Sequence, residues 1–326
     1  MKQIKRKIGI IISKIPQLDK VHSFFLAVNN VIYHWNERMH MIHPGNEDED
    51  KIYYVIRSRS HTEGLLSTYF YVLKSLMWAY GNGYVPYVEF KGSTCQYYVE
   101  REIYGCDNAW EYYFSQPSSA ENVRIDSKKN VLYSGWTFFD KLHINSVLNR
   151  EYDKKKFRKA AEQIMIQPYI KKMVDESWIQ KFQNKKTLGV FLRGTDYVEL
   201  RPKGHYMQPA IEDVISKIKE FLEKYDIKQI YVVTEDYNYF TEFQKTFGEM
   251  VFSNDENFVR AYTTKDYIST SFEDDPYERG LMYLIRLLLL AKCQYIISSK
   301  ANGSFFVDMI REQEPIDEYW FDLGKY

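Results

Sequence analysis

A short apolar pattern at 189–192 that stops abruptly at Arg193, Gly194, Thr195 and Asp196 constrains this chain more than any other feature. Continuous apolar runs bounded by turn residues are typical of strands buried on both faces of a parallel sheet. Open α/β sheets bind ligands at the carboxyl ends of their strands, where an arginine can hold two phosphate oxygens at once. The segment therefore predicts a phosphate site at Arg193. A loop salt bridge between Arg193 and Asp196 is the structural alternative.

Strand and helix patterns alternate through the rest of the second half. We expect strands at 188–192, 229–233 and 295–298, and helices at 209–225, 237–247, 276–292 and 305–310. This alternation is typical of a doubly wound α/β domain built on a parallel sheet.

The first half contains one clear β-α-β unit. Strand patterns at 52–56 and 84–90 flank a helical pattern at 65–80, which predicts parallel strands joined by a right-handed crossover. Residues 95–116 are dense in aromatic side chains, and we expect an insertion with short helices there.

A domain boundary is expected near residue 180. Residues 152–178 have a charged helical pattern that Pro168 divides into two helices, because proline breaks or kinks a helix interior. The strand that leads to Arg193 begins soon afterwards. The sequence therefore predicts an N-terminal domain over 1–180 and a C-terminal domain over 181–326.

The segment from Gly189 to Gln208 resembles the first peptide motif of the fucosyltransferase superfamily, which contains core α1,6-fucosyltransferases, nodulation fucosyltransferases and protein O-fucosyltransferases. The resemblance rests on Phe191-Leu-Arg-Gly-Thr-Asp196 and on His205 downstream. Stretches at 61–67, 230–236 and 279–304 resemble other segments of the family. The resemblance implies a GT-B-like architecture, with two Rossmann-like domains that face each other across a cleft. It also implies that 1–180 is the acceptor side and that 181–326 binds the nucleotide sugar.

Transfer of a sugar from a nucleotide sugar leaves negative charge on the diphosphate, which either a divalent ion or arginine and backbone amides can balance. Asp48-Glu-Asp50 lies inside an acidic run, 47–50, that ends no apolar strand, so we expect a solvated loop rather than a metal site. In the family, the arginine that corresponds to Arg193 contacts the β-phosphate of the donor. We expect further donor contacts at Gly194, Thr195, Asp196, Ser298, Ser299, Asn302, Gly303 and Ser304.

Asp196 has two open interpretations, since it could fix the arginine loop or cap a turn. Asp236 and Asp255 are candidates to accept hydrogen bonds from the N1 and N2 groups of guanine.

A general base would remove the proton of the acceptor hydroxyl. Glu63, Glu199 and His205 are the candidates. The chain departs from the family pattern in this region, because Phe191 replaces a histidine, Gly194 replaces a second arginine, and Arg201 stands where core fucosyltransferases carry a glutamate.

The composition of the chain limits the classes of molecule that it is expected to bind. The chain has equal numbers of acidic and basic residues and no basic stripe, which argues against nucleic-acid binding. Its three cysteines are odd in number and lack metal-ligand spacing, as expected for a reducing, cytoplasmic location. Residues 2–12 combine basic side chains with an apolar run that is too short to span a membrane. They form either a peripheral membrane contact or a first helix packed on the core.

Taken with these patterns, the resemblance to the fucosyltransferase superfamily implies an inverting, metal-independent glycosyltransferase without a cofactor. The expected reaction transfers fucose from GDP-fucose to a glycan hydroxyl in a surface polysaccharide or lipid-linked oligosaccharide. Two alternatives stay open: a GT-B glycosyltransferase with a different donor, or a non-catalytic protein that binds glycans or nucleotides.

Overall fold

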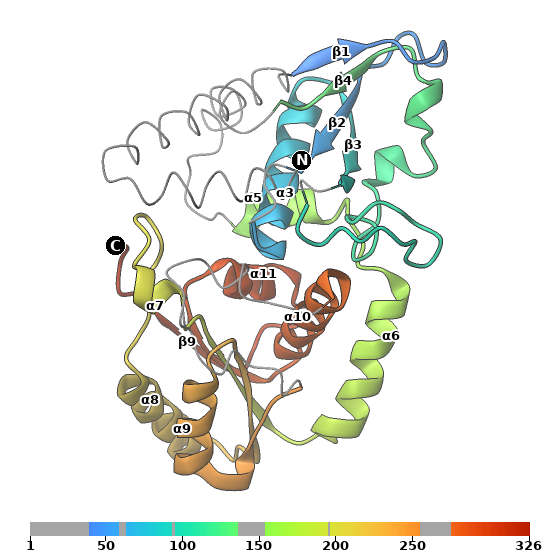
Figure 1. Ribbon diagram of the computed structural model, residues 1–326. Coiled ribbons are helices and arrows are strands. Elements are labelled where there is room, and N and C mark those ends of the chain that lie inside the picture. Colours follow the sequence, from blue (N-terminus) through green and yellow to red (C-terminus); the bar gives the residue numbers. More distant parts are fainter. Residues whose placement is uncertain (1–38, 59–62, 93–94, 136–153, 195, 255–274) are drawn as a thin grey trace, which may run out of the picture.

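The computed structural model describes residues 39–58, 63–92, 95–135, 154–194, 196–254 and 275–326. Within these ranges the chain forms two sheets, one in each half, with helices packed around them (Figure 1). The α/β class expected from the sequence is confirmed. No helix in the described ranges is long and apolar enough to cross a bilayer. The expected contact through residues 2–12 lies outside them.

The first sheet is built on the predicted β-α-β unit. Its four strands lie in the order β1-β4-β2-β3, and β2 pairs in parallel with both β3 and β4, whereas β1 is antiparallel to β4. The elements of this half are β1 (His40–Ile42), β2 (Tyr53–Arg57), α3 (Leu65–Gly81), β3 (Val85–Glu89), η2 (Ser118–Ala120), η3 (Ile125–Ser127) and β4 (Val131–Tyr133).

The prediction of short helices in the aromatic insertion, 95–116, was wrong. These residues form turns and take part in two isolated bridges, and most of their aromatic rings, among them Trp110 and Phe114, are buried, whereas Tyr104 is exposed. Asn108 explains how the segment folds without helices. Its side-chain oxygen accepts from the backbone N–H of Phe90 at 2.8 Å, and its amide donates to the carbonyl of Val88 at 2.7 Å. Side-chain hydrogen bonds to β3 thus replace the backbone bonds of a helix.

The acidic run 47–50 is exposed, as expected, but ion pairs fix its position. Lys128 Nζ lies 2.8 Å from both Glu47 Oε2 and Asp48 Oδ2, and the Tyr53 hydroxyl donates to Asp48 at 2.5 Å. The hydrogen bonds from Lys128 and Tyr53 lower the pKa of Asp48 to about 2. The Asp48 carboxylate is therefore committed to contacts within the fold.

Two helices and a π-helical turn connect the halves: α5 (Lys154–Ala161), α6 (Pro168–Ser177) and η4 (Trp178–Phe182). Pro168 separates the helices, as predicted, and starts α6, where its missing N–H costs no hydrogen bond. Helix α6 lies against α10, and Lys292 Nζ is 2.8 Å from Asp175 Oδ1 between them.

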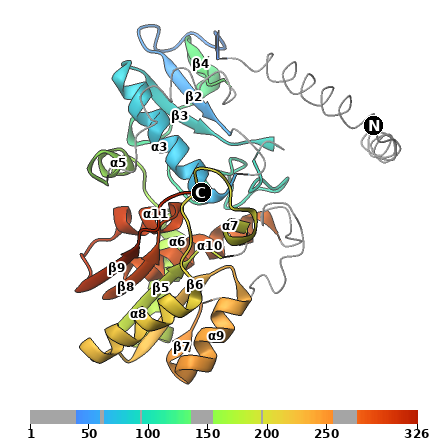
Figure 2. The same cartoon turned by 90° about the vertical axis from the view of Figure 1, so that its left-hand side faces the viewer.

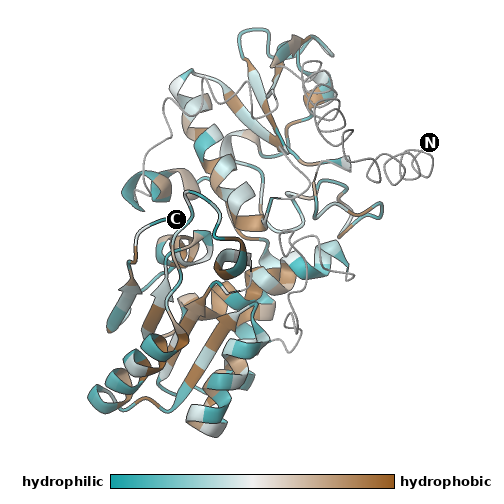
Figure 3. Ribbon diagram, turned by 60° about the vertical axis from the view of Figure 1, so that its left-hand side comes forward, coloured by the Kyte–Doolittle hydropathy of each residue, from teal (hydrophilic) through white to brown (hydrophobic). Residues whose placement is uncertain are grey.

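The second sheet is fully parallel and has the strand order β7-β6-β5-β8-β9. Figure 3 shows its central strands as mostly hydrophobic, whereas the peripheral helices expose hydrophilic faces. Its strands are β5 (Thr187–Leu192), β6 (Gln229–Thr234), β7 (Val251–Phe252), β8 (Tyr295–Ser299) and β9 (Asp317–Phe321). Its helices are α7 (Asp196–Leu200), α8 (Ile211–Lys224), α9 (Tyr237–Phe247), η5 (Gly248–Met250), α10 (Pro276–Ala291) and α11 (Asn302–Ile310).

One buried core continues from α3 in the first half into α10 and α11 in the second. Rings of Tyr69 and Phe306 meet edge to face at 5.1 Å, and the Tyr113 hydroxyl donates to the carbonyl of Tyr277 at 3.0 Å. A Cβ atom at Gly280 would lie 2.3 Å from the Tyr113 hydroxyl, so only glycine permits this approach. Figures 1 and 2 show α10 and α11 between the second sheet and α3.

Candidate active site

Arg193 stands at the point of the second sheet where the strand order reverses. It directly follows β5, which has β6 and β7 on one side and β8 and β9 on the other. Its backbone N–H donates to Gln208 Oε1 at 3.2 Å and to the hydroxyl of Ser299, the last residue of β8, at 3.4 Å. A reversal of strand order opens a crevice beyond the strand ends, and this is where α/β sheets bind ligands.

The guanidinium of Arg193 has two described neighbours. It forms an ion pair with Glu235, which follows β6, and the side chain of each residue is 18% exposed. Arg193 Cζ also lies 5.1 Å from the ring centroid of Tyr197, on which the His205 ring packs edge-on at 5.0 Å. Tyr197 therefore connects Arg193 to His205, one of the candidate bases.

Two of the departures from the family pattern have a packing explanation. A Cβ atom at Gly194 would lie 2.6 Å from the Cβ of Asp236. Likewise, a Cβ at Gly303 in α11 would lie 2.5 Å from the ring of Phe191, which is 2% exposed. Gly194 thus lets the arginine loop touch the loop after β6, and Phe191 forms the surface on which the start of α11 rests.

The serine-rich segment forms the expected strand and helix, but the helix begins at Asn302, three residues before the expected start at 305. Ser298 and Ser299 end β8 and are buried, and α11 starts at the exposed Asn302. Ser304 Oγ accepts from the N–H of Ala301 at 2.9 Å and donates to its carbonyl at 2.8 Å, so this hydroxyl caps the helix. The first N–H groups of an α-helix lack partners within it, and α11 presents them beside Arg193's end of the sheet.

Asp236 caps α9, where its carboxylate accepts from the N–H of Asn238 at 2.9 Å. Glu199 is exposed on α7. Thr195, Asp255 and the side chain of Asp196 lie outside the described residues. The roles expected for these residues in donor binding or base catalysis stay predictions.

Glu63 comes from the first half, immediately before α3, and its backbone carbonyl accepts from the side-chain amide of Gln96. Tyr97, which follows Gln96 in the chain, accepts a hydrogen bond from the backbone N–H of Leu65 through its hydroxyl at 2.9 Å. Burial raises the pKa of Tyr97, the Leu65 N–H and Arg279 lower it, and the Glu235 carboxylate adds to the rise. The charge of Glu235 therefore acts on Tyr97, whose hydroxyl accepts from the first N–H of α3.

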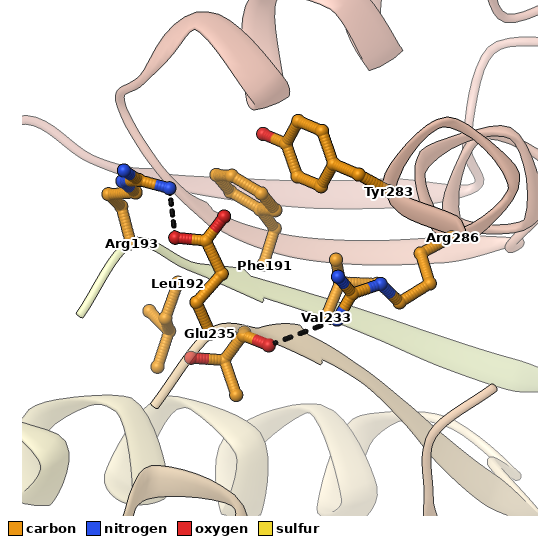
Figure 4. Close-up of a pocket in the computed structure, with 8 residues that line it drawn as sticks. Phe191, Leu192, Arg193, Val233, Glu235, Tyr283 and Arg286 are labelled. Atoms are coloured by element: carbon orange, nitrogen blue, oxygen red, sulfur yellow. Dashed lines mark hydrogen bonds and ion pairs between the residues drawn. The ribbon is translucent and has the colours of Figure 1, made fainter. Parts of the chain in front are cut away.

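A small pocket lies beside Arg193 and Glu235 (Figure 4). Its volume is about 210 Å³ including its open mouth, below the roughly 300–1,000 Å³ of sites that enclose a drug-sized ligand. It can therefore surround only part of a nucleotide sugar. The lining residues are Phe191, Leu192, Arg193, Val233, Thr234, Glu235, Tyr283 and Arg286.

Of these lining residues the sequence singled out only Arg193 as a site residue, and the residues it missed include Glu235, Tyr283 and Arg286. Glu235 lies in the Thr-Glu-Asp turn after β6, beside Asp236, which the sequence favours as a donor ligand. Arg286 had a clear signal, because it is a single charge inside the apolar run 281–290. Tyr283 precedes it by three residues and so lies on the same helix face. Among the described residues, no three His, Cys, Asp or Glu side chains gather as metal ligands.

No protein-family model matches the chain, and no curated protein matches it in sequence. Solved structures do match. The structure of NodZ α-1,6-fucosyltransferase soaked with GDP-fucose is 14% identical, with a TM-score of 0.52 over 80% of this chain and 92% of that chain. Selenomethionine fucosyltransferase NodZ from Bradyrhizobium is 13% identical, with a TM-score of 0.52 over 84% of this chain and 96% of that chain.

POFUT1 in complex with GDP is 11% identical, with a TM-score of 0.50 over 83% of this chain and 98% of that chain. The likeness therefore extends over nearly the whole of each solved chain. At such low identities it bears on the fold, and it agrees with the two sheets and the parallel strand order found above. The chain has the GT-B fold of these fucosyltransferases.

Proposed function

We propose that the protein is a glycosyltransferase that transfers fucose from GDP-fucose to a glycan hydroxyl, with inversion and without a metal. The observation that carries the proposal is the position of Arg193, at the strand reversal between β5 and β8 and next to the start of α11. The donor is proposed from the fold likeness to NodZ soaked with GDP-fucose and to POFUT1 in complex with GDP.

The reaction is a single displacement. The acceptor oxygen forms a bond to the anomeric carbon while the bond from that carbon to the β-phosphate oxygen breaks, and the electron pair leaves on the diphosphate. Arg193 and the first amides of α11 stabilise this charge, which grows in the transition state. A general base takes the proton of the hydroxyl, and Glu63, Glu199 and His205 are the proposed candidates.

We propose an acceptor in a surface polysaccharide or lipid-linked oligosaccharide, which suits a cytoplasmic enzyme that contacts the membrane peripherally. The roles of 1–180 as the acceptor side and of 181–326 as the donor side belong to the same proposal. Both follow from the resemblance and from the position of Arg193 in the second half.

The deciding experiment measures binding and hydrolysis of nucleotide sugars by the purified protein. We expect calorimetry to show tighter binding of GDP than of UDP or CDP, and we expect slow release of fucose from GDP-fucose without acceptor. Tighter binding of UDP or CDP would favour the same fold acting on another donor, which the replacement of the family's second arginine by Gly194 leaves open. Binding of GDP without any hydrolysis or transfer would indicate a non-catalytic binding protein.

A further inference from the structure

Arg286 is a buried cation, and no carboxylate in the described part of the chain pairs with it. It is 7% exposed, in the middle of α10. Within the described part of the chain, its guanidinium donates a hydrogen bond from Nη1 to the carbonyl of Thr234 at 3.4 Å and lies near the ring of Tyr283, whose centroid is 6.0 Å from Cζ. Its Nε has no hydrogen-bond partner among the residues that the structure describes.

Such an arrangement is costly, because a guanidinium has five N–H donors and burial removes the water that would satisfy them. Native structures leave few buried polar groups unsatisfied, and the exceptions call for an explanation. Packing alone does not supply one, since a methionine or leucine would fill the same position in this apolar helix.

The pocket supplies an explanation, since Arg193, Glu235 and Arg286 all line it. Figure 4 shows the Glu235 side chain extending between the two arginines, with its carboxylate on Arg193. All three charges affect the pKa of the nearby Tyr283 hydroxyl. Burial raises this pKa and Glu235 raises it further, whereas Arg193 and Arg286 lower it. The residues that line the pocket thus include one carboxylate, Glu235, and two cations, Arg193 and Arg286.

This ion pair conflicts with the role proposed for Arg193, because Glu235 and a diphosphate compete for the same guanidinium. If the diphosphate displaced Glu235 and no other cation were near, a poorly hydrated carboxylate would be left unpaired. Removing one partner of a buried ion pair is strongly destabilising for that reason.

We propose that Arg286 is a positioning residue that receives the Glu235 carboxylate when the donor diphosphate occupies Arg193. This inference rests on the proposed function. Before donor binding, Glu235 pairs with Arg193 and Arg286 is unpaired. After binding, Arg193 holds the phosphate and Arg286 holds Glu235, so one ion pair is exchanged for two. Arg286 acts on the donor only through Glu235.

Binding of GDP and GMP to full-length variants tests the exchange, because GMP lacks the β-phosphate assigned to Arg193. We expect Arg286→Met to weaken GDP binding about tenfold or more, equivalent to about 1.4 kcal/mol, and to leave GMP binding unchanged. Glu235→Gln should bind GDP at least as tightly as the wild type, because it no longer competes for Arg193. The double variant Glu235→Gln/Arg286→Met should recover the affinity that the single Arg286→Met variant loses.

The conservative substitution Arg286→Lys, made with and without Glu235→Gln, distinguishes a lost ion pair from a folding defect. We expect Arg286→Lys to weaken GDP binding less than methionine does, and to have no effect when Glu235 is already glutamine. Thermal unfolding of each variant shows whether the fold is retained. Equal losses for GDP and GMP, or no recovery in the double variants, would show that Arg286 is structural and would overturn the inference alone. Failure of the wild type to bind GDP would instead overturn the proposed function, and the inference with it.

Discussion

The Cβ atom of any side chain at position 194 would lie 2.6 Å from the Cβ of Asp236. The arginine loop and the loop after β6 therefore touch at a glycine. This contact also explains why the second arginine of the family motif is absent, since no side chain fits there without moving one of the two loops.

We expect Gly194→Ala to separate these loops and to move Arg193 away from the donor diphosphate. GDP affinity should fall about tenfold, and the free energy of unfolding should fall by about 1–3 kcal/mol, as for other overpacked sites. Calorimetry and urea unfolding measure the two quantities. Gly81→Ala is the matched control, because a Cβ at Gly81 has no atom within 4 Å. Equal behaviour of both variants would contradict the importance of the contact.

Arg193→Lys should leave less than about a tenth of wild-type turnover, because a point charge cannot replace a two-pronged contact with the diphosphate. The fold should be retained, since lysine can still pair with Glu235. Initial rates with GDP-fucose and a melting curve test the two statements. Turnover above a tenth of the wild-type rate, in a folded variant, would remove Arg193 from the donor site.

Turnover should survive dialysis against EDTA, because Arg193 and the amides of α11 are assigned the charge of the leaving group. Rates are compared before and after chelation, and again after addition of Mg²⁺ or Mn²⁺. A loss of activity that either ion restores would place a metal in the mechanism.

The candidate bases are tested by Glu63→Gln, Glu199→Gln and His205→Asn. Removal of the true base should lower turnover by about 10²–10⁴ and leave GDP affinity unchanged, because the base acts on the acceptor hydroxyl. Turnover and calorimetric affinity are both measured for each variant. Loss of GDP affinity would identify a donor ligand, and normal turnover in all three would place the base elsewhere in the chain.

Asp48 provides a test of stability against pH. Its folded pKa of about 2 lies below the usual value near 4, so its contribution to stability is present above about pH 4 and is lost as pH falls toward 2. Asp48→Asn should therefore be less stable than the wild type at pH 7, and the difference should shrink between about pH 4 and pH 2. Urea midpoints across this range test the expectation. Asparagine suits the site because Asp48 has a φ of 51°, a conformation in which asparagine is enriched.

The Asp48→Asn variant also tests whether the acidic run 47–50 has a structural or a catalytic role. Turnover of Asp48→Asn should equal that of the wild type, because the Asp48 carboxylate serves Lys128 and Tyr53. A loss of turnover in a stable variant would assign the run a role in the reaction.

The sequence predicted the elements whose burial is continuous along the chain. Strands β5, β6 and β8 are buried at every residue, so their apolar runs stand out, and Pro168 and the serine turn mark helix starts. Strands β1 and β4 have three residues each and could not be recognised, because so short a run has no measurable period. Strand β9 reads Asp-Glu-Tyr-Trp-Phe and lies at the edge of the sheet, where Asp317 pairs with Lys224 and Glu318 with Arg311, so its polar residues hide the strand pattern.

The candidate site was predictable only where a residue follows its strand directly, as Arg193 follows β5. The partner of Arg193 was not, because Glu235 reaches it across the sheet from the end of another strand. The prediction of short helices in the insertion 95–116 was wrong for a related reason. Asn108 stabilises the insertion through contacts with β3 and Phe90, and local sequence patterns do not reveal such contacts. Arg286 was visible as a lone charge in an apolar helix, but its meaning depends on the pocket.

The core that runs from α3 into α10 and α11 limits how the two halves of this chain can be exchanged for those of other proteins. Gly280 leaves room for Tyr113, and the ring of Phe306 packs on the ring of Tyr69. The surfaces of the two halves are therefore complementary in shape. A chimaera that joined the second half to the first half of a distant relative would lose these matched shapes, even if the residues proposed to act in catalysis were kept. New acceptor specificity is therefore more accessible through loops at the edge of the first sheet than through exchange of whole halves.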